Sequence, residues 1–164
     1  MLAHDLSSGG EREIARRASL WGRGFDLSPD GRWIVRTALD RATDLTHLLL
    51  YPVEGGAARE LLRASSADGI IGSFAKFTPD GKAILFAKGT RRKPREVWQI
   101  SIDGGEARKI DLDADWAARL ADPGTTSTSI HSDGHRVAFA TGGNEVEVWA
   151  MENIMATLKS GTQD

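Results

Sequence analysis

The sequence has no cysteine among its 164 residues. A disulfide framework, a thiolate nucleophile, a cysteine-ligated zinc site and an iron–sulfur cluster are therefore all excluded. A cysteine-free chain folds equally well in the cytosol and in the periplasm, so this absence leaves the compartment undetermined. No apolar run approaches the roughly 18 residues of a membrane-spanning helix, and residues 1–14 lack the basic and apolar regions of a secretory signal peptide. We expect no membrane insertion.

An excess of charge of one sign is also missing. The chain has 21 Lys and Arg against 23 Asp and Glu, a formal net charge of −2. Residues 1–82 carry 11 of each sign, and residues 83–164 carry 10 basic and 12 acidic side chains. Neither half is a basic arm or an acidic tail, so we do not expect a nucleic-acid partner.

Familiar catalytic and cofactor motifs are absent too. There is no Gly-x-Ser-x-Gly nucleophile elbow, no P-loop and no dinucleotide glycine motif that opens a helix. His131 and His135 are four residues apart, a spacing that would place two imidazoles on one face of a helix. They flank an Asp-Gly turn, however, so the spacing does not indicate a metal site here. The alternating aspartates of 111–115 resemble the start of a calcium loop, but Trp116 stands where that loop needs glycine. We predict no catalytic residue, no metal site, no cofactor and no enzymatic activity.

The sequence is rich in glycine, with 18 glycines against 5 prolines, and the glycines recur at a regular interval. The segment 28–32 (SPDGR) returns as 78–82 (TPDGK), at an offset of 50, and more weakly at 132–136, at an offset of 53 between the aspartates. Asp-Gly between apolar segments is a strong signal for a β-hairpin turn. The predicted turn residues are Pro29, Asp30, Gly31, Pro79, Asp80, Gly81, Asp133 and Gly134.

A double glycine forms a second series. The pairs are Gly9-Gly10, Gly55-Gly56 and Gly104-Gly105, spaced by 46 and 49 residues. The distance from Asp30 to Gly55 is 25 residues, and the distance from Asp80 to Gly104 is 24. Independent loops would not keep this constant phase, so the sequence contains a structural repeat.

Each repeat unit predicts four short antiparallel strands, and four-stranded units of this length are typical of β-propeller blades. We therefore predict an all-β fold of about three blades. A short helix is expected in 113–121, between aspartates and Pro123-Gly124. Recurring aromatic side chains are expected in the core between blades. They are Trp33, Phe77, Phe86, Trp98, Phe139 and Trp149, and the predicted units are the trailing strands 1–14 and the blades 24–63, 72–111 and 125–154.

These units resemble the WD40-like propeller repeat of the TolB type. The matching stretches are SPDGRWIV…HLLLYPVEGGAAREL, TPDGKAILFAKG…EVWQISIDGGEARKI and HSDGHRVAFATG…EVEVWAM. The third copy has lost its proline, and Phe25-Asp26-Leu27 and Phe77 replace the family's tryptophan before the turn. Similar units occur in periplasmic translocation proteins, in the non-catalytic half of prolyl-oligopeptidase-type peptidases and in sensor regions behind bacterial kinases. The resemblance thus implies a bacterial protein, extracytoplasmic if the chain is part of a longer one.

About three blades are fewer than the four to eight that close a propeller. We expect one of three arrangements: a segment of a longer propeller, a homodimer that completes a six-bladed ring, or an open arc. Strands 1–6 and 11–14 are candidates to complete the third unit. The leading functional hypothesis is a non-catalytic module that binds a protein or peptide. The alternative is the propeller fragment of a larger enzyme or sensor, such as a prolyl-oligopeptidase-type peptidase or a kinase or regulator.

Overall fold

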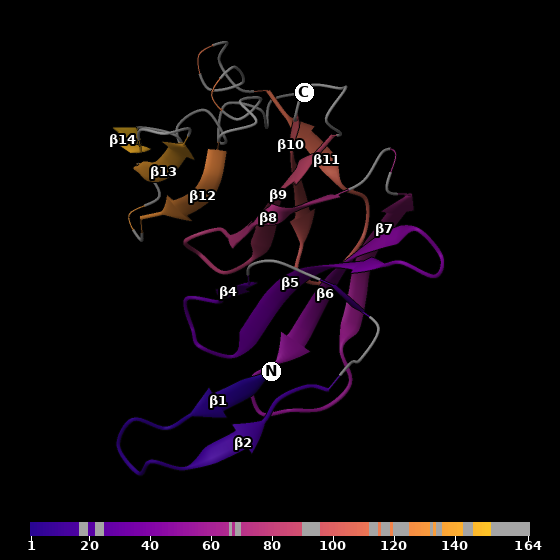
Figure 1. The fold of residues 1–164 in the computed structure, drawn as a ribbon, viewed down its shortest axis with the longest axis vertical. Coiled ribbons are helices and arrows are strands. Elements are labelled where there is room, and N and C mark those ends of the chain that lie inside the picture. The colour runs from indigo at the N-terminus through magenta and orange to yellow at the C-terminus, as the bar shows by residue number, and fades with distance from the viewer. Residues whose placement is uncertain are drawn as a thin grey trace.

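A computed structural model of the chain describes residues 1–16, 20–21, 25–65, 67, 70–89, 96–111, 115, 119, 125–131, 133, 136–142 and 146–151. All the secondary-structure elements with defined ends are strands, and they form antiparallel sheets (Figure 1). The all-β prediction is confirmed. Asp115 and Arg119 are helical, while the other residues of the predicted helix 113–121 lie outside the described part.

The chain begins with a separate two-stranded sheet. Strands β1 (Leu2–His4) and β2 (Glu11–Glu13) pair antiparallel, with Leu2 opposite Glu13. The first complete sheet follows, in the order β3-β5-β6-β7, and β3 and β4 pair along the same edge of β5. Its strands are β3 (Leu20–Trp21), β4 (Phe25–Leu27), β5 (Trp33–Asp40), β6 (Leu45–Pro52) and β7 (Arg59–Ser65).

The second complete sheet repeats this meander, and the last sheet repeats its first three strands. The second sheet has the order β11-β10-β9-β8, and the last has the order β12-β13-β14 among the residues described. The bounds are β8 (Ile70–Phe77), β9 (Ala83–Lys88), β10 (Glu96–Ser101), β11 (Arg108–Ile110), β12 (Thr125–Ile130), β13 (Val137–Gly142) and β14 (Val146–Met151).

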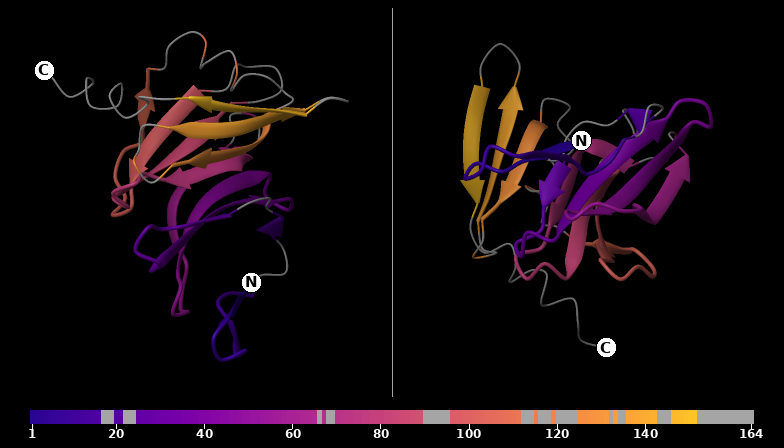
Figure 2. Two further views of the ribbon diagram at one scale, coloured as in Figure 1. Left: turned by 90° about the vertical axis from the view of Figure 1, so that its left-hand side faces the viewer. Right: turned by 90° about the horizontal axis from the view of Figure 1, so that it is seen from below.

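The sheets stack face to face along the molecule. Figure 2 shows the β1–β2 hairpin at one end of this stack and the β12–β14 sheet at the other. Strand β8 contacts β4, β5 and β6 on one side and β12 on the other. The first strands of successive sheets are therefore neighbours. The two ends that the sequence marks as incomplete units lie far apart within one chain.

The main core lies between the two complete sheets. Val35, Leu48 and Leu50 of the first sheet pack against buried side chains of the second, with Phe86 fully buried among them. Trp33 and Trp98 are partly buried against this core, as expected for aromatic residues between sheets. The side chains of Phe139 and Trp149 lie outside the described part of the structure.

Thr37 is the exception in this core. It lies on β5 and is 1% exposed, and its hydroxyl has no hydrogen-bond partner within the described residues. The repeat places Ala87 and Ala140 at the same position of the other two units. A buried hydroxyl without a partner lowers stability, because it loses its hydrogen bonds to water.

We therefore expect Thr37→Val, which keeps the shape of the side chain, to raise the free energy of unfolding by about 1 kcal/mol. Urea denaturation monitored by tryptophan fluorescence would measure this change. Thr37→Ser is the control, because it keeps the hydroxyl and should give no gain. A loss of stability in Thr37→Val would show that the hydroxyl has a partner in solution.

Candidate functional site

The first Asp-Gly turn is held by one hydroxyl and one carboxylate. The Ser28 hydroxyl donates to Asp30 Oδ1 at 2.6 Å and accepts from the Trp33 N–H at 2.9 Å. Asp30 Oδ1 also accepts from the Arg32 N–H at 3.0 Å. Gly31 has a φ of 71°, a left-handed conformation that costs glycine little. These bonds fix the direction in which β5 leaves β4.

The second turn repeats this geometry. The Thr78 hydroxyl donates to Asp80 Oδ1 at 2.6 Å and accepts from the Ala83 N–H at 3.0 Å, and Asp80 Oδ1 accepts from the Lys82 N–H at 3.1 Å. The two turns lie side by side, because a β-carbon at Gly81 would be 3.5 Å from Cδ of Pro29. The predicted turn residues of the first two units therefore form one rim of the stack.

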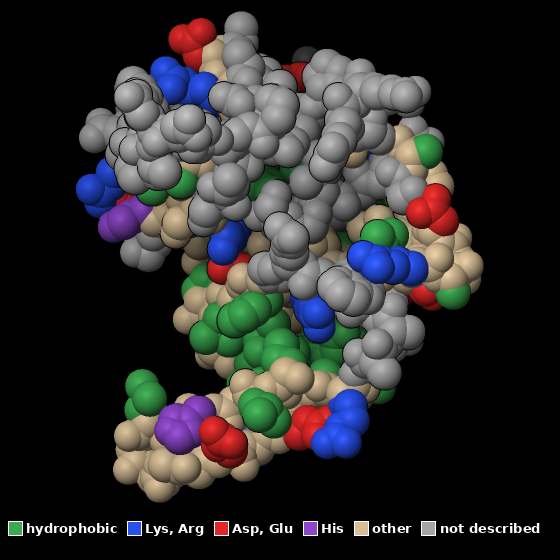
Figure 3. Space-filling view, in the orientation of Figure 1, with side chains coloured by type: hydrophobic (Ala, Val, Ile, Leu, Met, Phe, Trp, Pro, Cys, Tyr) green, Lys and Arg blue, Asp and Glu red, His purple; other side chains and the backbone are tan. Residues whose placement is uncertain are grey.

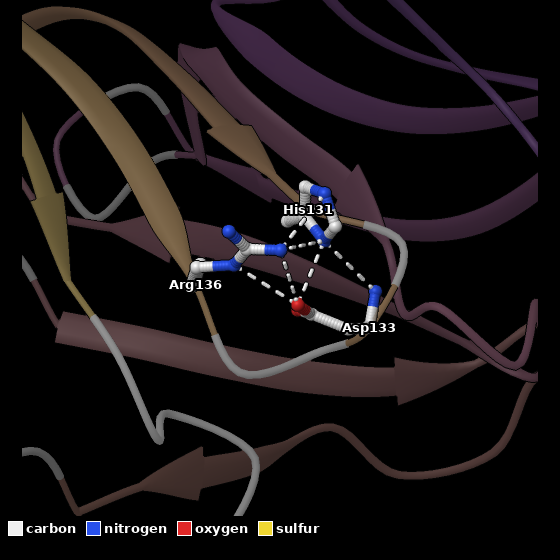
Figure 4. A network of polar contacts seen from close by, with 3 residues as sticks. All are labelled: His131, Asp133 and Arg136. Carbon is white, nitrogen blue, oxygen red and sulfur yellow. Dashed lines mark hydrogen bonds and ion pairs between the residues drawn. The ribbon is translucent and has the colours of Figure 1, made fainter.

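The third turn uses different chemistry at the same positions. Its backbone closes with a bond from His131 N to Arg136 O at 2.9 Å, as the first closes from Ser28 N to Trp33 O at 2.8 Å. His131 thus takes the place of the serine. Figure 4 shows the Arg136 guanidinium donating to Asp133 Oδ2 at 2.8 Å, with His131 Nδ1 2.9 Å from the same oxygen. Gly134 and His135 lie outside the described residues.

The shared turn geometry makes folding stability depend on pH. The pKa of Asp80 lies below its ordinary value, chiefly because the Thr78 hydroxyl donates to it, and hydrogen bonding by Ser28 lowers the pKa of Asp30 in the same way. A carboxyl with a lowered folded-state pKa contributes stability above its unfolded-state pKa. This contribution is lost as the pH falls through the folded-state pKa.

We accordingly expect the free energy of unfolding to fall below about pH 4. Asp80→Asn should reduce this dependence, because the amide oxygen accepts the same bonds without titrating. Urea midpoints measured from neutral pH to about pH 3 would test this. Asp103→Asn is a matched control, because the Asp103 side chain has no hydrogen-bond partner among the described residues. Equal pH profiles of the two variants would contradict the prediction.

The double-glycine turns join the third strand of a sheet to its fourth. Gly55 and Gly56 connect β6 to β7 with φ values of 91° and 117°, and Gly104 and Gly105 connect β10 to β11 with 94° and 99°. The pair Gly9-Gly10 connects β1 to β2, so these two strands correspond to the third and fourth strands of a unit. The predicted glycines in the described part therefore lie in the connections between strands.

Among the described residues, no group of three or more His, Cys, Asp or Glu side chains is arranged to hold a metal ion. Within that same part of the chain, no helix has the length and apolar character needed to cross a membrane.

A contact between the two complete sheets was missed by the sequence reasoning. Asp26, on β4, accepts from Lys76 Nζ at 3.0 Å and from the backbone N–H of Phe77 at 2.9 Å. The side chains of Asp26 and Lys76 are only 25% and 20% exposed. Asp26 and Lys76 lie at the same position of successive repeats, at an offset of 50. Comparison of charges at equivalent repeat positions could have predicted this pair.

A second feature missed by the sequence reasoning is the uncovered face of the first complete sheet. Phe25 and Leu27 on β4 are 64% and 52% exposed. The equivalent residues of the next sheet, Ala75 and Phe77, are 9% and 4% exposed, because the first sheet covers them. In Figure 3 hydrophobic side chains are visible on this part of the molecule, above the protruding β1–β2 hairpin. The same two repeat positions are thus buried in the second complete sheet and exposed to solvent in the first.

Arg36 lies on the same uncovered face. It pairs with Phe25 across the sheet and stands where the other repeats have Phe86 and Phe139. Arg36 is half-buried, and the described residues give it neither an ion pair nor a hydrogen bond. It lines a cavity of about 320 Å³ between the hairpin and the first complete sheet. The other lining residues are Met1, Leu2, Glu13, Ala15, Arg16 and Tyr51.

We call the surface formed by Phe25, Leu27 and Arg36 the open face. The hairpin covers only the neighbouring part of the sheet, where Ile14 packs with Ile34, Ala38, Leu49 and Tyr51. Arg12 of the hairpin donates to the Val53 carbonyl and lies 3.4 Å from a Glu54 carboxylate oxygen. Phe25 and Leu27 therefore lie beside the hairpin, and Arg36 lies at its border, in the cavity between the hairpin and the sheet.

Comparison with solved structures shows the same fold in β-propellers. TolB from Acinetobacter baumannii gives a TM-score of 0.60 at 19% identity, over 91% of this chain and 34% of TolB. The β-propeller domain of the Trilobed protease from Pyrococcus furiosus gives 0.51 at 13% identity, over 90% and 44%. A puromycin hydrolase gives 0.58 at 24% identity, over 90% and 22%. No family model and no curated protein matches the sequence.

The chain therefore has the fold of β-propeller blades and is a partial propeller similar to TolB, as the repeats predicted. It covers less than half of each of these three solved chains. At these levels of identity the likeness concerns the fold. The activities of the complete proteins are not transferred by it, because function on a shared fold depends on the particular site.

Proposed function

We propose that this chain is a non-catalytic β-propeller module that binds a polypeptide. The observation that carries the proposal is the open face, where Phe25 and Leu27 are more than half exposed although their repeat equivalents are core residues. Exposed apolar surface of this kind marks interaction sites in folded proteins. A polypeptide that covers the face would bury the two side chains as the first sheet buries Ala75 and Phe77.

A photo-crosslinking experiment tests this proposal. A photoreactive phenylalanine analogue at position 25 should crosslink to extended peptides from a random-sequence library, and unmodified peptide should compete. The same analogue at position 103, in the exposed turn between β10 and β11, is the control. Equal crosslinking at the two positions, or no saturable binding of any peptide, would contradict the proposal.

The second candidate is the propeller segment of a larger enzyme or sensor. Its support is that the solved chains with this fold include a puromycin hydrolase and prolyl endopeptidases. Under this proposal the open face contacts the remainder of the same protein. A hydrolase or kinase domain encoded in frame with this chain would favour it, and further repeat units alone would favour the binding module.

A further inference from the structure

We propose that the open face binds a pair of extended strands that carries an acidic side chain opposite Arg36. This inference rests on the proposed function and names the chemistry and placement of the polypeptide. It combines three observations on the described residues: a strand edge that no described strand pairs with, an exposed apolar surface, and a half-buried arginine to which no described side chain supplies a counter-ion.

The first step concerns the strand edge. Strand β1 pairs with β2, and the other edge of β1 has no partner among the described strands. In the complete sheets the corresponding edges of β6 and β10 pair with β5 and β9. An unpaired edge offers backbone N–H and C=O groups to an added strand. Two added strands would take the positions of the first and second strands of a propeller blade.

The second step is where those added strands would lie. The first strands of successive sheets contact each other, as β4 contacts β8. The first added strand would consequently lie against β4 and cover Phe25 and Leu27. The 320 Å³ cavity beside β1 lies where the incoming pair meets the first complete sheet.

The third step is charge. Phe86, the repeat equivalent of Arg36, packs in the same core cluster as Val35 of the preceding sheet. The residue at the Val35 position of the added pair would therefore face Arg36. Glu13, which lines the same cavity as Arg36, is bonded to Arg16 at 2.7 to 3.1 Å, and no carboxylate of the described hairpin residues pairs with Arg36. A carboxylate from the incoming strand meets this need, because an arginine removed from water requires a charged partner.

A second copy of the chain fits the open face less well. The other end of the described stack is the β12–β14 sheet, which has three strands, whereas the β1–β2 sheet needs two more to match the four strands of the β8–β11 sheet. At the Val35 position this sheet has Ala138, which has no carboxylate. The homodimer considered from the sequence is therefore the competing outcome of the test rather than the proposal.

The probe is the chain's own inner strand pair. Three peptides of residues 72–88 are each closed by a disulfide between added terminal cysteines. They differ only at Leu85, the repeat equivalent of Val35. One keeps Leu85, and the other two carry Leu85→Glu or Leu85→Lys. The disulfide holds the hairpin, which is otherwise marginally stable. It cannot exchange with this cysteine-free protein. Titration calorimetry measures each peptide against the wild-type chain and its variants.

The wild-type chain should bind the Leu85→Glu peptide at least about tenfold more tightly than the Leu85→Lys peptide. Arg36→Glu should reverse that order, and Arg36→Phe, which restores the residue type of the other repeats, should prefer the unmodified peptide. Arg108→Glu, an equal change of charge on the outer strand β11, should keep the wild-type order.

Peptide affinities that do not depend on the charges at positions 36 and 85, or the absence of binding by any peptide, would overturn this inference. Continued crosslinking at position 25 would in that case leave the proposed function standing, whereas loss of all crosslinking would remove both. A solution mass of twice 17.7 kDa that Arg36→Glu returns to the single mass would assign the face to a second copy, and would likewise overturn the inference.

Discussion

Replacing Phe86 with alanine is expected to lower the free energy of unfolding by about 3–5 kcal/mol, the largest effect of any single substitution proposed for this chain. Phe86 is fully buried between the two complete sheets and packs with Val35, Leu48 and Leu50. Truncation removes most of a large apolar side chain and leaves a cavity that two hydrogen-bonded sheets cannot easily close. Urea denaturation followed by circular dichroism would measure the loss.

The control for this prediction is the exposed phenylalanine of the preceding repeat. Phe25→Ala removes the same atoms from a side chain that is 64% exposed, and should change stability by less than about 0.5 kcal/mol. Similar losses in both variants would mean that the open face is covered in solution. A small loss in Phe86→Ala would mean that the two sheets do not pack as the structure shows.

The second large effect is expected at the contact between the sheets. Asp26→Ala removes the carboxylate that holds both Lys76 and the Phe77 N–H. It leaves a half-buried ammonium and a backbone donor without their partner. We expect a loss of about 2–3 kcal/mol, since hydrogen bonds to charged groups are stronger than neutral ones and the abandoned groups stay partly desolvated.

Two further variants separate the parts of this contact. Asp26→Asn keeps an acceptor for the Phe77 N–H and should lose less than Asp26→Ala. Asp103→Ala, in an exposed turn, should stay within about 0.5 kcal/mol of the wild-type protein. The double variant with Lys76→Met tests the pairing directly, because Asp26→Ala should cost less once the ammonium is gone. Purely additive losses would show that the two side chains act independently.

The fold was predictable because the turns carry their own chemistry. An Asp-Gly turn needs a residue that tolerates positive φ and a side chain that bonds the backbone, so its position could be found without tertiary contacts. The repeat then fixed the register of the strands that flank each turn. His131 shows the limit of this reasoning: the repeat aligns it with Ser28 and Thr78, but the contacts of Asp133 with Arg136 and His131 in the third turn are not evident from the sequence.

The candidate site was less predictable, because it depends on which sheet faces lack a neighbour. Phe25 and Leu27 are apolar in a strand and would be assigned to the core on pattern alone. Their exposure depends on whether another sheet packs against this face of the first complete sheet. The local sequence around β4 carries no information about that. Arg36 was open to prediction, since an arginine in register with Phe86 and Phe139 is a conflict within the repeat.

The linear order of the sheets has a consequence for how the protein loses its structure. Each sheet is stabilised only by the sheets next to it, so unfolding should behave as a chain of nearest-neighbour couplings. The β8–β11 sheet has a packed neighbour on both sides, whereas the β1–β2 hairpin has one. Amide exchange should thus be slowest in β9 and fastest in the hairpin, with the molecule opening from its ends inward.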